Sequence, residues 1–150
     1  MVEIWVEDEN EANRVSEAIV EAFAKHYAFE VERIMVRRLH EAGPPHGTPI
    51  SLTGDLANSI HVVHSGGKWR VVIDSEYADY VEYGTRPHWM PVAAALRYAR
   101  LRGKPDSFAF AMRAKVAKEG TKAHPFIEPA MIEAAEPALV KALLEVVGRA

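Results

Sequence analysis

The sequence has no cysteine among its 150 residues. Disulfides, thiolate nucleophiles and cysteine-ligated zinc or iron–sulfur sites are therefore excluded, and the composition fits a reducing compartment. The chain also lacks the run of about 18 apolar residues that a membrane-spanning helix needs. Its acidic beginning, MVEIWVEDENEANR, does not have the pattern of a signal peptide. With 49% hydrophobic and 26% charged residues, we expect one globular domain with its own core.

The usual sequence signatures of catalysis and cofactor binding are also missing. Neither a G-x-S-x-G nucleophile elbow nor a G-x-G-x-x-G dinucleotide fingerprint occurs. The stretch from Ser65 to Lys68, SGGK, precedes a predicted strand rather than the helix that would hold a phosphate. His61 and His64 have opposite parity in a strand, so they cannot easily chelate one metal ion together. We therefore expect no enzymatic activity, no cofactor and no metal site.

The net charge is only −3, but it is unevenly distributed along the chain. Residues 1–33 hold nine acids and three bases, whereas residues 86–123 hold nine bases and two acids. Such a subunit suits contact between an acidic and a basic surface of neighbouring copies. Nucleic acid is the alternative partner for the basic segment 86–122, and a solvated helix face is the plainest interpretation. Three arginines are candidate contact residues: Arg97, Arg100 and Arg113.

The spacing of apolar residues predicts a long helix followed by a β-hairpin. Apolar side chains recur at steps of three and four from Val15 to Leu39, which predicts a helix from Asp8 or Asn10 to about His40. At about 1.5 Å per residue, 30 residues span roughly 45 Å, so part of this helix should pack on something beyond a small domain. The stretch HVVHSGGKWRVVID predicts strands over 60–65 and 68–74 around a Gly-Gly turn.

Shorter elements complete the predicted fold. Residues 2–7 alternate like an edge strand, and residues 42–50 form a loop with three prolines. Four further helices are expected, over about 53–59, 75–84, 91–103 and 106–120, and the two of these that lie within 91–119 form a basic helical hairpin. A two-stranded sheet is marginal, so it should recruit residues 2–7, segments near 86–90 and 121–125, or a neighbouring subunit.

The last helix should begin near HPFIEPAM, and Pro137 should kink or divide it. Its predicted apolar face comprises Ile132, Leu139, Val140, Leu143 and Val147. Because helices follow a hairpin instead of alternating with strands, the fold class is α+β. In this fold a long N-terminal helix and the C-terminal helices pack on a small, mainly antiparallel sheet built around the hairpin at 60–74.

The stretch SEYADYVEYGT, residues 75–85, combines three tyrosines with three acidic residues. Glu76, Asp79 and Glu82 could serve acid–base chemistry only if some were buried and perturbed, and no partner histidine lies near them in the sequence. A structural role is therefore preferred over a hydrolase site. In that role, the acids face water or a basic partner. Tyr77, Ala78 and Val81 are then buried, with Tyr80 and Tyr83 half-buried: tyrosine, with its polar tip, suits interfaces.

Three blocks of sequence, taken together, resemble the HK97 gp10-like family of tailed-phage proteins. They are LTGDLANSI at 52–60, YADYVEYGT at 77–85 and HPFIEPAM at 124–131, and they follow one another in the family's order. The positions that match the family pattern are Thr53, Gly54, Leu56, Ser59 and Ile60 in the first block, Tyr77, Ala78, Tyr80, Val81, Glu82, Gly84 and Thr85 in the second, and Pro125, Phe126, Pro129 and Ala130 in the third.

The resemblance implies a structural virion protein of a tailed phage or prophage, made in the host bacterial cytoplasm. Such proteins act at the head–tail junction or in tail completion. The implied partners are copies of the chain itself, in a ring in the virion, and neighbouring neck or tail proteins, with weak DNA contact as a further option. The basic helical hairpin at 91–119 is a variable insertion in this interpretation. A DNA-binding module that uses residues 86–122 is the alternative function.

Overall fold

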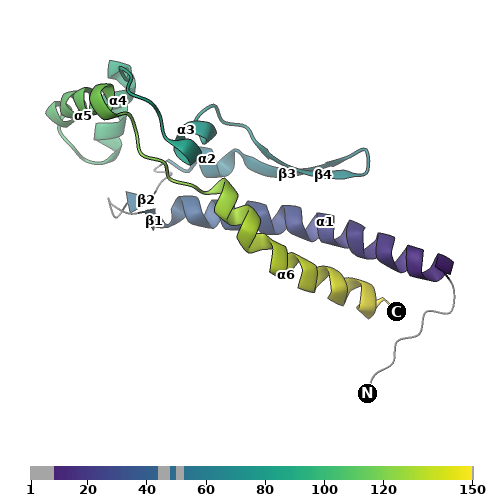
Figure 1. Ribbon diagram of the computed structural model, residues 1–150. Helices are drawn as coiled ribbons and strands as arrows, with labels where there is room; N and C mark the ends of the chain where they lie inside the picture. Colours follow the sequence, from purple (N-terminus) through teal and green to yellow (C-terminus); the bar gives the residue numbers. More distant parts are fainter. Residues whose placement is uncertain (1–8, 44–47, 50–52, 150) are drawn as a thin grey trace.

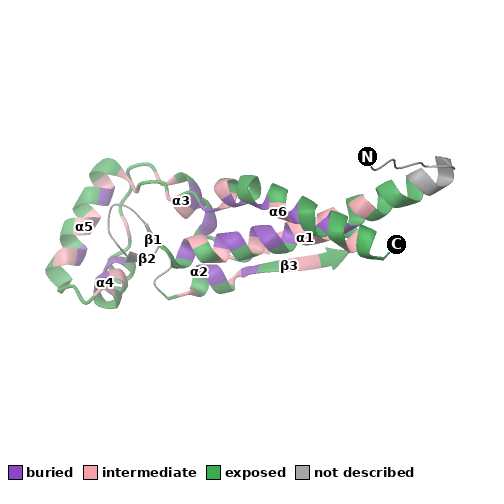
Figure 2. Cartoon of the chain, turned by 90° about the horizontal axis from the view of Figure 1, so that it is seen from below, coloured by how far each residue is buried: buried purple, intermediate pink, exposed green. Residues whose placement is uncertain are grey.

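The computed structural model describes residues 9–43, 48–49 and 53–149 of the chain. Its longest element is helix α1, Glu9–His40, which lies between a β-hairpin and helix α6, Ile127–Gly148 (Figures 1 and 2). The hairpin consists of β3, Ile60–Ser65, and β4, Lys68–Ile73, paired antiparallel from Ile60–Ile73 to Ser65–Lys68. The predicted α+β fold is thereby confirmed.

The main core forms where one half of α1 meets the hairpin, two short helices and the start of α6. These short helices are α2, Asp55–Asn58, and α3, Ala78–Tyr83. The largest fully buried side chains are Ile34, Met35, Leu39 and Phe126. Val71 and Ile73 of β4 pack against this cluster, as their shared parity predicts.

A second, smaller cluster lies at one end of the molecule (Figure 1). It is formed by α4, Val92–Leu101, and α5, Asp106–Glu119, which pack as a helical hairpin. Ala95, Ala99 and Ala109 are buried between these helices. The first turns of α1 lie at the opposite end of the molecule, so the overall shape is elongated.

The two clusters are joined by a narrow crossing of two chain segments. Thr85 and Thr121 form an isolated antiparallel bridge, and the Thr85 Oγ1 lies 2.9 Å from the Thr121 Oγ1. The two segments therefore pair with each other at this point and not with β3 or β4, so this one of the three predicted extensions of the hairpin sheet, by the segments near 86–90 and 121–125, is not found among the described residues. The predicted strand at 2–7 lies outside the described residues.

The remaining elements follow the sequence pattern with small differences. Two-residue strands, β1 at Ala42–Gly43 and β2 at Thr48–Pro49, occupy the described parts of the predicted loop. Helix α3 begins about one turn later than expected, at Ala78. Pro137 lies inside α6 without dividing it. None of the described helices combines the length and the apolar character that crossing a membrane requires.

A candidate assembly surface

The carboxylate of Glu82 is buried and binds the beginning of α6. Its side chain is on α3, and its residue is 3% exposed. Glu82 Oε2 accepts hydrogen bonds from the backbone N–H groups of Phe126, at 2.7 Å, and Ile127, at 2.9 Å; Oε1 accepts one from Glu128, at 3.0 Å. The first N–H groups of a helix have no partner within that helix and carry its positive dipole end. Glu82 therefore acts as an N-terminal cap supplied from 44 residues away.

This arrangement corrects the expected orientation of α3. Glu76 and Asp79 face water as predicted, but Glu82 does not. The three tyrosines expected to be buried or half-buried are exposed: Tyr77, Tyr80 and Tyr83. The helix has only six residues, and its buried side is formed by Ala78, Val81 and Glu82, which share one face at steps of three and four.

Two glycines allow the crossing between the clusters to close. Gly84 has φ of 71°, and a Cβ there would lie 2.5 Å from the backbone oxygen of Thr121. Gly120 has φ of 74°, and a Cβ there would clash with the backbone oxygen of Thr85. Each glycine thus sits against the threonine of the opposite segment. A side chain at either position would be strained and would also push the two segments apart.

The three sequence blocks that carry the phage-family resemblance meet in one structural unit. Leu56 and Ile60 of the first block, Ala78 of the second, and Phe126 and Ala130 of the third belong to the main core. The His124 N–H donates to the Val81 backbone oxygen at 2.7 Å, beside the Glu82 cap. The Ser59 hydroxyl donates to the Leu56 backbone oxygen at 2.7 Å and closes the end of α2. Burial in the core or a local hydrogen bond therefore accounts for Leu56, Ser59, Ile60, Ala78, Val81, Phe126 and Ala130.

Helix α6 packs on α1 through its smallest side chains. Four fully buried alanines recur at every fourth residue: Ala130, Ala134, Ala138 and Ala142. Positions four residues apart form one stripe along a helix. Because alanine side chains are short, this stripe lets the two helices lie close together.

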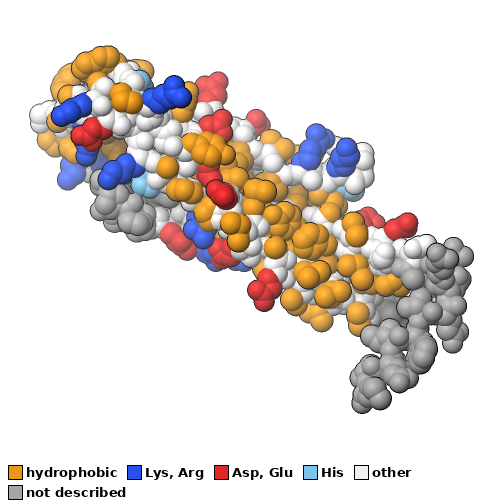
Figure 3. All heavy atoms as spheres, viewed as in Figure 1, with side chains coloured by type: hydrophobic (Ala, Val, Ile, Leu, Met, Phe, Trp, Pro, Cys, Tyr) orange, Lys and Arg blue, Asp and Glu red, His pale blue; other side chains and the backbone are white. Residues whose placement is uncertain are grey.

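The opposite side of α6 exposes large apolar side chains. We define the α6 outer face by five residues of its C-terminal half: Leu139, Val140, Leu143, Leu144 and Val147. Leu144 is 68% exposed and Val147 is 69% exposed. Figure 3 shows apolar side chains gathered along α6. The apolar face predicted from the sequence is thus present, but within the described chain it faces solvent instead of the core.

Ionic contacts keep charge away from the α6 outer face. Between Pro137 and Gly148 only Lys141 and Glu145 are charged, and both bind α1. Lys141 Nζ pairs with the buried Glu30 carboxylate. Glu145 receives Lys25 Nζ at 3.0 Å and lies 2.6 Å from His26 Nε2. The outer face in this half of α6 is therefore uncharged.

The same contacts affect the acidic groups. The hydrogen bond from Lys141, assisted by Arg33, lowers the pKa of Glu30, against the opposing effect of burial. Hydrogen bonds from Lys25 and His26 lower the pKa of Glu145. Near the start of α6, hydrogen bonds from Arg37 and Arg38 lower the pKa of Glu133. When they are ionised, these three carboxylates therefore form ion pairs that stabilise the packing of α6 on α1.

The basic helical hairpin places its three candidate contact residues differently. Arg97 and Arg100 are exposed on α4. Arg113 is half-buried on α5, where its Nε donates to the Met90 backbone oxygen at 2.7 Å. Its guanidinium also lies 5.4 Å from the centre of the Trp89 ring. Arg113 therefore stabilises the loop before α4, and of the three candidate arginines only Arg97 and Arg100 are exposed on the surface.

Two features of the structure, the Glu82 cap and the alanine stripe of α6, were not predicted from the sequence. The role of Glu82 depends on backbone groups 44 residues away, and no local pattern reports such a distant contact. The alanine stripe is visible in the sequence as A-x-x-x-A-x-x-x-A-x-x-x-A from Ala130 to Ala142. An alanine at every fourth residue, with larger apolar residues on the other side of the helix, indicates that the alanine face could be the one that packs on a neighbouring helix.

Comparisons with known proteins give no relative of this chain: no family model, no curated protein and no solved structure matches it. Among the described residues, no three histidine, aspartate or glutamate side chains lie close enough to hold a metal ion.

Proposed function

We propose that this chain is a structural virion protein of a tailed phage or prophage. It acts at the head–tail junction or in tail completion, where it associates with copies of itself and with neighbouring neck or tail proteins. The α6 outer face carries the proposal of association. Five neighbouring apolar residues in contact with water, with no charge among them, are typical of a surface that another protein covers.

The phage assignment rests on the three sequence blocks. Their positions, distant in the sequence, build one unit in which Glu82 caps α6 and Gly84 lets two segments cross. These roles suit a family whose motif residues are structural and not catalytic. The exposed tyrosines Tyr77, Tyr80 and Tyr83 add amphipathic side chains to the surface of this unit, and such side chains are common where proteins meet.

The association is tested by placing charge on the α6 outer face. The variant Leu144→Glu with Val147→Glu should weaken self-association about tenfold or more, since charges would be buried in an apolar contact. Its free energy of unfolding should change little because both side chains are largely exposed. Sedimentation velocity over a range of concentrations measures the association, and Phe110→Glu on α5 is a matched control at another exposed apolar residue.

An association constant that is equal in the variant and the parent would reject the α6 outer face as the contact. The virion assignment has its own test, which is mass spectrometry of purified phage particles followed by antibody labelling in the electron microscope. Labelling at the neck or at the end of the tail is expected. Absence of the chain from the particles would refute the virion role even if the protein associates.

A further inference from the structure

A shallow groove lies on the outer side of α4. We call it the α4 groove, and it is lined by Ala93, Leu96, Arg97, Arg100 and Leu101. These positions follow the i, i+3, i+4, i+7, i+8 pattern that defines one face of a helix. Leu101 is half exposed and Leu96 is partly buried against the smaller cluster, while the fully buried residues of α4 are Ala95 and Ala99. The groove therefore offers an apolar surface with two cationic side chains to an incoming helix.

The arginines of this groove are weakly engaged within their own chain. The Arg97 side chain is 71% exposed, and its Nη2 lies 3.6 Å from Asp55 Oδ2. The Arg100 side chain is 68% exposed, and its Nε lies 3.8 Å from Asp106 Oδ1. Exposed pairs at such distances contribute little to stability. Both guanidinium groups can therefore turn to a carboxylate from another molecule at small cost.

A surface of complementary composition lies on the first turns of α1. We call it the acidic end of α1, and it is formed by Glu17, Val20 and Glu21, which share one helix face at steps of three and four. All three are exposed, and Val20 is 67% exposed. No ion pair involves Glu17 or Glu21 among the described residues. Residues 1–24 contain seven acids against a single base, Arg14.

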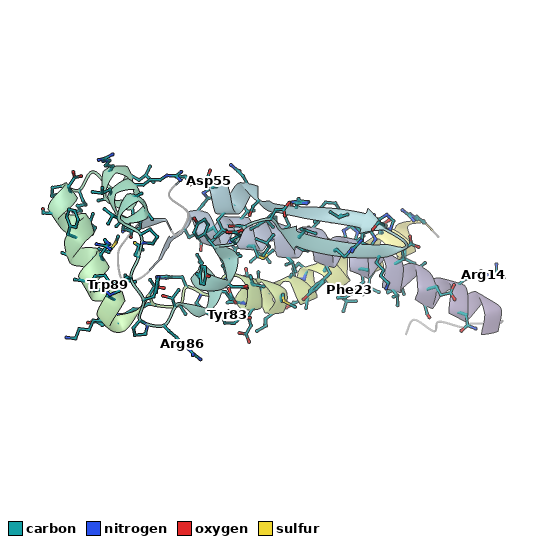
Figure 4. All side chains as sticks on the ribbon, turned by 90° about the horizontal axis from the view of Figure 1, so that it is seen from above. Arg14, Phe23, Asp55, Tyr83, Arg86 and Trp89 are labelled. Atoms are coloured by element: carbon teal, nitrogen blue, oxygen red, sulfur yellow. The ribbon has the colours of Figure 1, made fainter. Side chains whose placement is uncertain are left out.

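These two surfaces cannot meet within one chain. Figure 4 places Arg14, on the first turns of α1, and Trp89, beside the α4–α5 hairpin, at opposite ends of the elongated molecule. Their complementary charge can therefore be satisfied only between two molecules. Contact between two different surfaces of identical chains is heterologous, and it repeats from copy to copy into a ring or a filament.

We propose that the acidic end of α1 of one copy binds the α4 groove of the next. Val20 contacts Leu96 and Leu101, while Glu17 and Glu21 pair with Arg97 and Arg100. The two glutamates are about 6 Å apart along their helix, and the two arginines about 4.5 Å apart along theirs, so each acid reaches one guanidinium. This inference rests on the self-association proposed above and adds a second contact between copies, separate from the α6 outer face.

The geometry is tested by cross-linking, for which the absence of native cysteine is useful. Val20→Cys and Leu101→Cys are made in separate chains, mixed and oxidised. A disulfide-linked heterodimer should form several-fold faster than from Val20→Cys mixed with Lys68→Cys, whose cysteine lies at the exposed hairpin turn. A rate no higher than that of this control, at every protein concentration reached, overturns the proposal.

The charge pairing is tested by reversal and exchange. Glu17→Lys with Glu21→Lys, and Arg97→Glu with Arg100→Glu, should each weaken self-association about tenfold, because like charges replace opposite ones. A chain that carries all four changes should recover association, since the charges are complementary again. Sedimentation velocity at low and high salt provides the measurement, and the parent should associate more weakly at high salt.

The outcomes separate this inference from the proposed function. If the parent associates but neither reversal weakens it and exchange has no effect, the contact is wrong while self-association stands. If the parent shows no association and no cross-link, both fail. If Arg97→Glu with Arg100→Glu abolishes binding to a DNA duplex and leaves self-association unchanged, the α4 groove is a nucleic-acid surface and the inference is overturned.

Discussion

At the scale of single residues, the carboxylate of Glu82 provides the cap that α6 lacks at its own N-terminus. No side chain at the cap position itself, Phe126, bonds the first turn. Glu82 supplies two oxygens for three N–H donors; of the donor residues, Phe126 belongs to the main core and Ile127 packs against it. A buried acidic residue beside tyrosines resembles a catalytic group, yet both of its oxygens already accept backbone hydrogen bonds. The contact ties α3 to α6.

We predict that Glu82→Gln lowers the free energy of unfolding by about 2 kcal/mol. The amide offers only one acceptor oxygen, and its NH₂ group would face a backbone N–H, so at least one N–H donor of the first turn of α6 loses its partner. The charge that favours the helix N-terminus is also removed. Chemical denaturation measures the change, and Asp79→Asn, an exposed acid on the same short helix, is the control. Equal stability of Glu82→Gln and the control would contradict the capping role.

Gly84 combines a backbone conformation reserved for glycine, with φ of 71° and ψ of −177°, with close approach of another segment. Gly84 and Gly67 both have φ of 71°, but a Cβ at Gly67 meets nothing within 4 Å. We predict that Gly67→Ala costs about 1–2 kcal/mol from the left-handed conformation alone. Gly84→Ala should cost roughly 3 kcal/mol or more, because its φ and ψ are almost restricted to glycine and its Cβ would also displace the Thr121 segment. Thermal and chemical unfolding of the two variants provide the comparison, and equal losses would show that the crossing tolerates a side chain.

At the scale of elements, periodicity predicted where the long helices and the hairpin lie. The steps of three and four from Val15 to Leu39 gave α1 almost to the residue, because helix length and face follow from local spacing. The Gly66-Gly67 turn gave the hairpin register for a similar local reason. Both elements depend on neighbours in the sequence, and both were predicted correctly.

The side on which an element is buried was harder to predict. On α6 the larger apolar residues suggested the core face, but the alanine stripe lies against α1. Leu143 is the more hydrophobic residue and was therefore predicted to face the core. Ala142 is buried instead, because its short side chain lets the two helices approach closely. On α3, Tyr77 was predicted to be buried and Glu82 to be exposed, and the structure shows the reverse. These orientations depend on residues far away in the sequence, so local spacing identified the faces but not their partners.

The α1–α6 contact should weaken in acid. The pKa values of Glu30, Glu133 and Glu145 are lowered from their ordinary value of 4.5 by cationic partners. A folded-state pKa below the unfolded one gives stability that is present above pH 4.5 and is lost as pH falls through the folded pKa. We therefore predict that the free energy of unfolding decreases below pH 4.5.

A matched pair of variants on α6 tests this cause. Glu133→Gln should flatten the acid dependence, because it removes the carboxylate that Arg37 and Arg38 hold. Glu136→Gln, which changes an exposed acid without an ion pair among the described residues, should leave the dependence unchanged. Denaturant unfolding at a series of pH values provides both slopes. Parallel slopes for the two variants would mean that the Glu133 pairs do not contribute.

At the scale of the whole molecule, the two clusters are joined by the Thr85–Thr121 crossing and, among the described residues, by the exposed Arg97–Asp55 ion pair. The buried residues of the main core all lie outside residues 87–119, and the smaller cluster is formed by α4 and α5 alone. Between them, Thr85 and Thr121 each donate a backbone hydrogen bond to the other, at 3.1 and 3.3 Å. The α4–α5 hairpin therefore contributes no buried residue to the main core, and the α4 groove lies on this hairpin.

This organisation predicts that the hairpin can be removed. Thr85 and Thr121 pair antiparallel, so the chain on either side of them can be closed by a short turn. A turn of about four residues could replace residues 87–119 and connect Arg86 to Gly120. The shortened chain should unfold cooperatively with a similar midpoint, as followed by circular dichroism, since its main core is intact. Its self-association should be about tenfold weaker than that of the full chain, as it should be for Arg97→Glu with Arg100→Glu, because the α4 groove is missing and the α6 outer face remains. A shortened chain without a cooperative transition would show that the hairpin stabilises the main core, and one that associates as tightly as the full chain would overturn the α4 contact.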